Sequence, residues 1–211
     1  MRMRKKKWAE PFLEENSDIV IKNPQQNCGN WKNILSKNEL HLEIGCGKGD
    51  YFVNMSKLHT HTGWIAVEKD RNVAAVAAKK IKEEKCDSCC IIAFDAKDLD
   101  QWFLDNEIHT IHLNFSDPWS KNGYRKRRLS HESFLKTYKR ILSPDGRIIM
   151  KTDNKKLFEF SLCEFSRCGW VIDDVWMDFR SEDHNEDVLS EYESKFVQLN
   201  LPIYRAIFKL K

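Results

Sequence analysis

A glycine-rich turn flanked by acidic residues is the part of this sequence best equipped for chemistry. The run LEIGCGKGD (42–50) lies where a predicted strand passes into a predicted helix. Glycines in such a turn let the backbone approach a ligand at the carboxyl edge of a sheet. The dinucleotide pattern G-x-G-x-x-G is not met, because Asp50 stands where its third glycine would be. The carboxylates of Glu43 and Asp50 also disfavour a pyrophosphate and favour a cationic ligand.

Two further acids fall at the ends of the next two predicted strands. Glu68 closes the second strand, a position from which a carboxylate accepts hydrogen bonds from ribose hydroxyls. Asp95 follows the third strand, where it could accept a bond from an adenine amino group. Helix capping is the alternative for any such acid, and for Asp95 alone the two interpretations fit equally well. With Glu43, Gly45 and Gly47, they predict a site for S-adenosylmethionine, which carries a sulfonium and an ammonium but no phosphate.

Short apolar runs alternate with amphipathic stretches along the chain, which predicts strands and helices in turn. Strands are expected at 40–44, 63–67, 89–93, 108–115, 147–151, 170–177 and 203–210. Helices are expected at 51–58, 72–84, 99–104, 132–142 and 155–167, with a turn at 144–146 and an irregular segment at 16–31. This alternation is typical of an α/β domain with a mostly parallel sheet and helices on both faces. The last two strands have no long helix between them, so they are expected to form an antiparallel edge.

Length and charge suggest one domain with a polyanionic partner. The 211 residues fit a single domain, 1–211, whose basic segment at 1–30 could be flexible. The net charge is only +3, but basic residues concentrate at 2–7 and 121–128, and acidic residues at 182–193. Such basic patches suit a polyanion, although a solvated charge run is the usual alternative.

The same sequence argues against a membrane protein and against a metal site. No apolar run approaches the roughly 20 residues that span a bilayer, and no secretory signal follows the basic N-terminus. The seven cysteines are odd in number, and the cluster Cys86, Cys89 and Cys90 has no second pair at zinc-site spacing. We therefore expect reduced, mostly buried thiols, no bound metal, no membrane partner and a cytoplasmic location.

The fourth predicted strand runs into LNFSDPW (113–119), which a basic stretch follows. At this point the sequence resembles the bacterial tRNA (guanine-N7-)-methyltransferases, over nearly its whole length. Other matching runs are RKKKWA (4–9), LEIGCGKG (42–49), KRRL (126–129), KTDN (151–154) and SEYE (190–193). The NFSDPW run with its basic loop is the specific part, because most class I methyltransferases share the glycine turn. Ser120 replaces the usual Pro and Ser190 the usual Thr, and neither change removes a charge.

The resemblance implies a Rossmann-like class I methyltransferase fold, with a seven-stranded sheet and one antiparallel edge strand. It also implies methyl transfer from S-adenosylmethionine to N7 of guanine 46, in the variable loop of tRNA. The sequence leaves open whether the enzyme is a monomer or a homodimer. Residues expected to line the donor and catalytic region are Glu43, Gly45, Gly47, Glu68, Asp95 and Asp117. Residues expected to contact the substrate are Lys121, Asp153, Ser190, Glu191, Tyr192 and Glu193. The loop expected to touch RNA comprises Asn122, Gly123, Tyr124, Arg125, Lys126, Arg127 and Arg128.

The chemistry of guanine refines these roles. Because N7 already has an in-plane lone pair, its methylation depends on positioning more than on a strong base. We interpret Asp117 as the catalytic residue that orients the guanine N1–H or amino group, with Asp153 also holding the guanine edge unless it caps a helix. Trp119 either stacks on an extruded base or is a core aromatic. Surface solvation is the alternative for Glu191 and Glu193.

Three competing functions remain at this stage. An amino-methyltransferase acting on adenine or cytosine would normally carry two prolines where Asp117 is followed by one. A non-catalytic RNA-binding module is disfavoured because the acids of the predicted donor site are all present. A nicotinamide-dependent dehydrogenase is disfavoured by Asp50.

Overall fold

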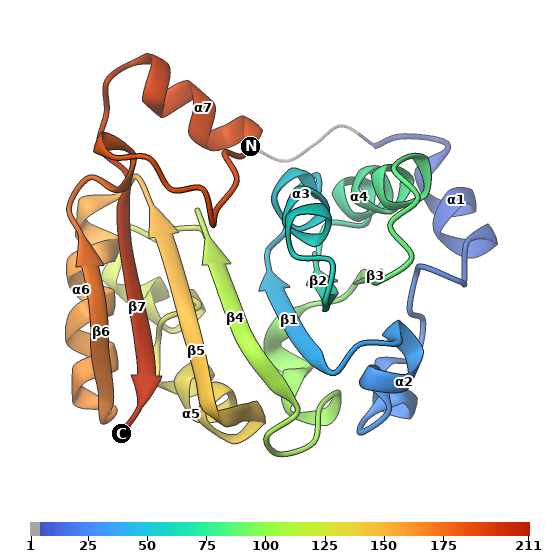
Figure 1. Cartoon of the computed structure of the whole chain (residues 1–211), viewed down its shortest axis with the longest axis horizontal. Helices are drawn as coiled ribbons and strands as arrows, with labels where there is room; N and C mark the ends of the chain where they lie inside the picture. The colour runs from blue at the N-terminus through green and yellow to red at the C-terminus, as the bar shows by residue number, and fades with distance from the viewer. Residues whose placement is uncertain (1–4) are drawn as a thin grey trace. The chain divides into compact units, whose positions relative to one another are not determined.

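The computed structural model describes residues 5–211, so the basic residues at 1–4 lie outside the described part of the chain. The chain forms two compact units, Met1–Leu104 and Asp105–Lys211. In both units strands alternate with helices, as the hydrophobic pattern predicts (Figure 1).

The first unit is built on three parallel strands in the order β3-β2-β1. These are β1 (Glu39–Ile44), β2 (Thr62–Val67) and β3 (Cys89–Ile92). Nearly every residue in them is buried, which explains their continuous apolar character. The crossover helices are α3 (Asp50–Leu58) and α4 (Arg71–Glu83), and the shorter elements are α1 (Ala9–Glu15), η1 (Pro24–Asn27), α2 (Trp31–Leu35) and η2 (Ala96–Gln101).

Helix α4 begins at a well-formed cap and anchors the N-terminal part of the chain. The Asp70 carboxylate accepts from the N–H groups of Asn72 and Val73, which satisfies donors that the first helical turn leaves open. The N–H of Lys6 donates to Asn72 Oδ1 at 2.8 Å, and Arg71 forms an ion pair with Glu10 of α1. The described part of the basic N-terminal segment is thereby tied to α4.

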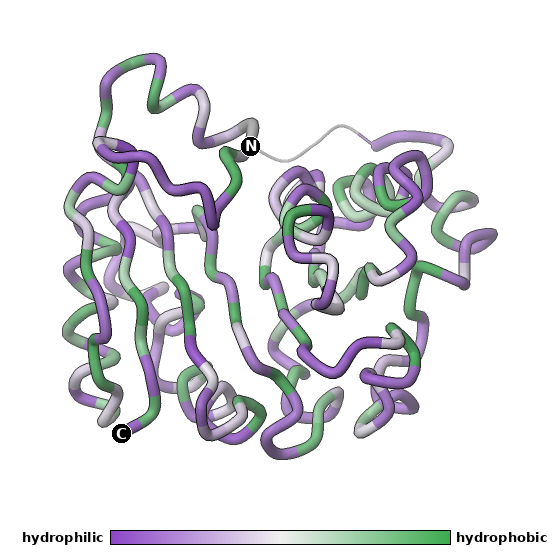
Figure 2. The backbone as a smooth tube through the Cα atoms, viewed as in Figure 1, coloured by the Kyte–Doolittle hydropathy of each residue, from purple (hydrophilic) through white to green (hydrophobic). Residues whose placement is uncertain are grey.

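The second unit contains four strands in the order β4-β5-β7-β6. They are β4 (Ile108–Asn114), β5 (Leu142–Thr152), β6 (Trp170–Trp176) and β7 (Tyr204–Leu210). Strands β4 and β5 are parallel, whereas β7 is antiparallel to both β5 and β6, which confirms the predicted antiparallel edge. The other elements are η3 (Asn122–Arg127), α5 (Glu132–Ile141), α6 (Lys155–Arg167), η4 (Phe179–Ser181) and α7 (Glu191–Gln198). Helix α6 packs on β5, β6 and β7, and hydrophobic residues recur along these strands (Figure 2).

Two local predictions were wrong. The turn at 144–146 does not precede the fifth strand but forms a bulge inside it, because Ile108 pairs with Leu142 and Thr110 already pairs with Arg147. The helix expected at 99–104 is instead the 3-10 helix η2, which starts where Asp95 caps it. With those corrections, seven mostly parallel strands with an antiparallel edge and helices around them agree with the predicted α/β class.

Candidate active site

The glycine turn of the first unit holds an open backbone conformation after β1. Gly45, Gly47 and Gly49 have φ values of +79°, +57° and +85°, a region that other residues enter only with strain. A Cβ atom on Gly45 or Gly47 would meet no atom within 4 Å, so the turn borders open space there. A Cβ on Gly49 would lie 2.9 Å from Phe52 and 3.0 Å from Ala77. The first two glycines are therefore suited to a close ligand, and the third to close packing of α3 on α4.

Glu68 fixes this turn from the end of β2. Its Oε2 accepts from the N–H of Gly47 at 3.2 Å, and its Oε1 accepts from the N–H of Asp70 at 2.9 Å. Burial raises the pKa of Glu68 above its ordinary value, and these two N–H groups partly offset that rise. Each carboxylate oxygen keeps a second lone pair, so Glu68 can still accept bonds from a ligand hydroxyl.

Acidic groups also surround Cys46 inside the turn. Burial, together with the negative charges of Glu43 and Glu68, raises the pKa of the Cys46 thiol well above its ordinary value. The thiol is therefore protonated at neutral pH and is no nucleophile. Glu43, at the end of β1, is buried, with 2% of its surface exposed. The region around the turn carries the negative character that the sequence predicts.

The two other acids of this unit have local structural partners. Asp50 pairs with Lys80 of α4, so the lysine offsets the charge on which the sequence argument against a pyrophosphate partly relied. Asp95 caps η2, because its Oδ1 accepts from the N–H of Lys97 at 3.1 Å. The side chain of Asp95 is exposed. The capping role is confirmed for Asp95, and donor contact stays a prediction.

In the second unit, a strained turn follows β4. Phe115 and Trp119 have positive φ values of 49° and 42°, which are uncommon for such bulky residues and cluster at functional sites. Asp117 lies exposed between them. The guanidinium of Arg128 holds the turn, because its Nε donates to the Pro118 carbonyl at 2.9 Å and its Nη2 to the Trp119 carbonyl at 3.1 Å.

Asp153 lies at the end of β5 and does not cap the helix that follows. Asn154 is the cap of α6, since its side chain accepts from the N–H of Leu157 at 2.9 Å. Asp153 makes no side-chain hydrogen bond or ion pair with the residues that the structure describes. Burial and the charge of Asp153 raise the pKa of Tyr192, whose ring lies 5.0 Å from that of Phe115. One carboxylate and two aromatic rings are thus gathered at this strand end.

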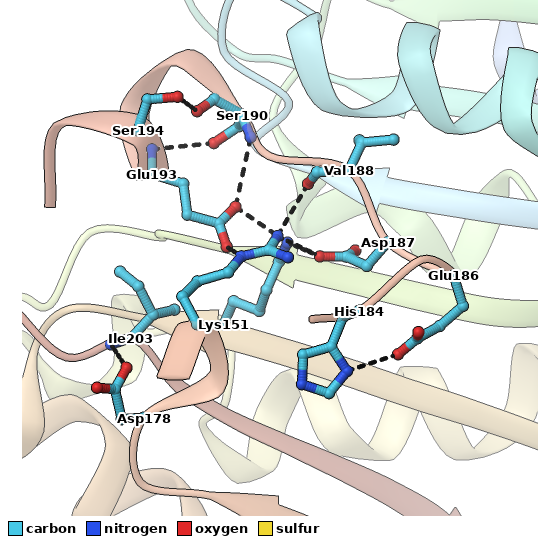
Figure 3. Close-up of polar contacts among 11 residues, drawn as sticks. Lys151, Asp178, His184, Glu186, Asp187, Val188, Ser190, Glu193, Ser194 and Ile203 are labelled. Atoms are coloured by element: carbon cyan, nitrogen blue, oxygen red, sulfur yellow. Dashed lines mark hydrogen bonds and ion pairs between the residues drawn. The ribbon is translucent and has the colours of Figure 1, made fainter. Parts of the chain in front are cut away.

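The SEYE run (190–193) begins helix α7, which the sequence analysis did not predict. Ser190 and Glu193 form a reciprocal capping box, and the N–H of Glu193 donates to Ser190 Oγ at 3.1 Å. Glu193 is fully buried and bound to Lys151 (Figure 3) and to Arg180. Its neighbour Tyr192 is 47% exposed. The side chain of Glu191 lies outside the described part of the structure. Surface solvation is therefore wrong for Glu193, and substrate contact by this run stays a prediction.

The basic loop is largely exposed and includes an aromatic cluster. Exposed residues of the loop are Lys121, Asn122, Gly123, Tyr124, Arg125, Lys126 and Arg127. The Arg127 guanidinium lies 5.0 Å from the Trp119 ring and 4.8 Å from the Tyr124 ring. Trp119 is half-buried against these two side chains, so it belongs to the loop and is no core aromatic. The guanidinium of Arg128 points into the turn and stacks on Phe160 at 4.3 Å, and its phosphate contact stays a prediction.

Sequence reasoning missed Phe115 and the basic partners of Glu193 as candidate site residues. Phe115 stood inside a recognised motif, but its contact with Tyr192 depends on a helix 76 positions later that was not predicted. The spacing Ser190-x-x-Glu193 is itself a capping-box signature and could have revealed α7. Lys151 begins the matching run KTDN (151–154), but no sequence signal links it to Glu193, and none singles out Arg180.

Three further features concern the cysteines, the possible metal ligands and the helices of the chain. All seven cysteines are free, and four of them are buried. Among residues 5–211, no three His, Cys, Asp or Glu side chains are grouped as metal ligands would be. Over the same residues, none of the helices has the length and apolar character needed to cross a membrane.

Comparisons with known proteins show the family and the fold of this chain. The model of a family described as "Putative methyltransferase" matches residues 37–206. The tRNA (guanine-N(7)-)-methyltransferase of Limosilactobacillus reuteri (strain DSM 20016) is 42% identical over 213 residues, covering 100% of both chains. The protein of that name from Bacillus velezensis is 41% identical, covering 98% of this chain and 95% of its own. A solved "antibiotic related methyltransferase" shares 18% identity with a TM-score of 0.61, covering 83% of this chain and 92% of its own, which confirms the Rossmann-like methyltransferase fold.

Proposed function

Because this chain belongs to the tRNA (guanine-N(7)-)-methyltransferase family, we propose that it transfers the methyl group of S-adenosylmethionine to N7 of guanine 46 in tRNA. The observation that carries the proposal is the bond from Gly47 to Glu68, beside glycines that border open space. A carboxylate held at that strand end suits the ribose of a nucleoside, and the acidic surroundings suit a cation.

The residues around the turn fit S-adenosylmethionine. Glu68 would accept from the ribose hydroxyls and Asp95 from the adenine amino group, while Glu43 contributes negative charge opposite the sulfonium and ammonium. Gly45 and Gly47 leave room for the ligand, since nothing lies within 4 Å of the positions where their Cβ atoms would be. The bound donor would supply an electrophilic methyl group.

The strand ends of the second unit would hold the guanine. Asp117 and Asp153 would accept hydrogen bonds from its N1–H and amino group, and Phe115 and Tyr192 would contact the flat face of the ring. Neither carboxylate needs to remove a proton, because N7 attacks through its own lone pair. Holding the nucleophile in line with the methyl group contributes about 7–11 kcal/mol in well-oriented reactions.

The exposed basic loop would bind the tRNA backbone. Lys121, Arg125, Lys126 and Arg127 present positive charge to solvent, and phosphate contacts of this kind give salt-dependent affinity without reading the sequence. The ring of Trp119 is available for stacking on a splayed base once Arg127 is displaced. A cytoplasmic location, the absence of a metal requirement and a monomeric or dimeric state remain predictions.

Methyl transfer to unmodified tRNA tests this function directly. The protein is incubated with labelled donor and total tRNA that lacks the modification, and the digested nucleosides are identified by mass spectrometry. We expect 7-methylguanosine as the labelled product. Methylated adenosine or cytidine would instead support an amino-methyltransferase, and an unlabelled tRNA pool would support an RNA-binding module.

The same assay tests the assignment of Asp117. The Asp117→Ala variant should lose transfer by at least a hundredfold, because the guanine is no longer oriented, while calorimetry shows donor affinity close to that of the wild type. A fully active variant would remove Asp117 from the catalytic role.

A further inference from the structure

Four charged side chains meet at the start of helix α7 (Figure 3). Lys151 Nζ lies 2.8 Å from Asp187 Oδ2 and 3.2 Å from Glu193 Oε2. The guanidinium of Arg180 lies 2.7 Å from Glu193 Oε1 through Nε, and 2.6 Å from Asp187 Oδ2 through Nη2. The side chains of Lys151 and Glu193 are 0% exposed, and those of Asp187 and Arg180 only 3% and 13%. Two cations and two anions are therefore joined away from solvent.

Burying four charges is a poor way to gain stability. The loss of hydration offsets most of the attraction between the ions, and apolar side chains of similar size often stabilise a core as well or better. Buried ions do impose a specific geometry, because each must face its partner. Burial opposes the charge of Arg180, but its bonds to Glu193 and Asp187 outweigh that effect and raise its pKa. A geometric role is the better explanation for this network.

The network joins the end of β5 to the first turn of α7. Lys151 is in β5, two residues before Asp153, while Arg180 lies in η4 and also donates to the Val188 carbonyl at 3.1 Å. Glu193 receives bonds from both cations, and its capping box with Ser190 fixes the helix start. Its neighbour in the sequence is the half-exposed tyrosine whose ring lies against Phe115.

We propose that Lys151, Arg180 and Asp187 are positioning residues for the methyl transfer. Through Glu193 they hold the first turn of α7 in place, and so keep Tyr192 beside Phe115 and Asp153. This inference rests on the proposed function and assigns Glu193 an indirect role, although its motif suggested a substrate contact. The carboxylate is already engaged by two buried cations, so it acts on the guanine site only through the helix that it anchors.

The charge balance of the network distinguishes an anchoring role of Glu193 from a direct contact with the substrate. Glu193→Gln leaves one excess positive charge in the network, and Lys151→Met leaves one excess negative charge. The double variant Lys151→Met/Glu193→Gln restores neutrality and keeps the Arg180–Asp187 pair. We expect each single variant to lose at least tenfold in kcat/KM for tRNA, and the double variant to recover at least tenfold over Glu193→Gln. A double variant no more active than Glu193→Gln would show direct contact and overturn the proposal.

A second pair protects the test against variants that fail to fold. Arg180→Gln/Asp187→Asn removes the opposite pair and leaves Lys151 with Glu193, so it should also exceed both of its single variants. If Lys151→Met/Glu193→Gln does not fold, Arg180→Gln/Asp187→Asn alone decides, and no recovery in it would contradict the positioning role. Glu159→Gln, an exposed acid on α6, is the matched control for loss of a charge and should behave like the wild type.

Hydrogen exchange makes the test independent of catalysis. The amides of residues 190–198 should exchange at least tenfold faster in each single variant and return toward the wild-type rate in the double variants. Unchanged exchange in the single variants would overturn the proposal even if their activity fell. A wild-type protein that methylates no tRNA would refute the proposed function alone, because exchange would still report on the network.

Discussion

Arg127 and Arg128 are adjacent in the sequence, but their side chains have different surroundings. Arg127 is exposed over two aromatic rings, whereas Arg128 donates to two backbone carbonyls of the Pro118–Trp119 turn. Sequence patterns cannot separate such neighbours, because both simply extend a basic run. At the scale of single residues, the predicted phosphate-binding loop therefore contains an exposed arginine and an arginine that holds the neighbouring turn.

Substitution of each arginine tests this division. Arg127→Ala should raise the KM for tRNA and reduce the slope of log affinity against log salt by about 1, because one phosphate contact is lost. Arg128→Ala should instead lower the free energy of unfolding by about 1–2 kcal/mol, because two carbonyls lose a charged donor. Filter binding at several salt concentrations and urea unfolding provide the two measurements. Equal effects of the two variants on the salt slope would place both side chains on the RNA.

The raised pKa of Glu68 predicts a pH dependence of donor binding. Burial raises this pKa above its ordinary value in the free protein, so the carboxylate takes up a proton at a higher pH than an exposed glutamate does. A cationic donor with hydroxyl groups favours the ionised form, and binding should therefore release a proton when the pH is low. Donor affinity should rise with pH through the pKa of Glu68 and then become constant.

Calorimetry between pH 5 and pH 8, in two buffers of different ionisation enthalpy, measures this effect. The Glu68→Gln variant should bind the donor more weakly, and its donor affinity should no longer depend on pH over this range. A wild-type affinity that falls as the pH rises over this range would contradict the assignment.

At the scale of single residues, several roles could be predicted from sequence and several could not. Glu43 was recognised because it stands beside the glycine turn, and Glu68 because it closes the second predicted strand, and the structure gathers both around the turn. The capping role of Asp95 and the pairing of Asp50 with Lys80 depend on local geometry and on a helix face, which motif spacing does not specify. The role of Glu193 depends on cations from β5 and η4 that no local pattern links.

Among the elements, the turn between β1 and α3 combines a ligand role with a packing role. Gly47→Ala should cost about 1–2 kcal/mol of unfolding free energy, because an alanine is strained at a φ of +57°. It should also weaken donor binding, since its methyl group enters the open space beside the turn. Gly49→Ala combines similar backbone strain with a clash against Phe52 and Ala77. It should therefore lower the free energy of unfolding by about 2–4 kcal/mol.

Urea unfolding and donor titration compare these two variants. We expect Gly49→Ala to have the lower free energy of unfolding. We expect Gly47→Ala to have the lower donor affinity when only the folded protein is counted. The reverse order of both effects would show that the assignment of the two glycines is inverted.

Most strands and long helices were predictable, because their apolar residues recur with a clear period. Helix α6 begins and ends at the predicted residues, and β6 and β7 pair antiparallel as expected. The short elements were missed: α1, α2 and α7 have five to eight residues, too few for a reliable helical period. Helix α7 is held by a capping box and buried ion pairs more than by an apolar face. The bulge in β5 was misread because Pro144 and Gly146 normally mark a turn between elements.

At the scale of the whole molecule, charge distribution matters more than net charge. The net charge of +3 is small for a protein that binds tRNA, yet four exposed cations lie within residues 121–127. Acidic residues elsewhere, including those buried around Lys151 and Arg180, balance them in the total. Net charge is therefore a weak guide to the partner, and the local basic loop is the better one.

The central claim is that the chain methylates one guanine of tRNA at N7, and mapping the modified nucleotide tests it most directly. Unmodified tRNA is incubated with the protein and S-adenosylmethionine, reduced with borohydride and cleaved with aniline at 7-methylguanosine. We expect one new cut, at guanine 46 of the variable loop, which depends on the donor and disappears with Asp117→Ala. Cuts at another guanine, or none despite methyl incorporation, would contradict it.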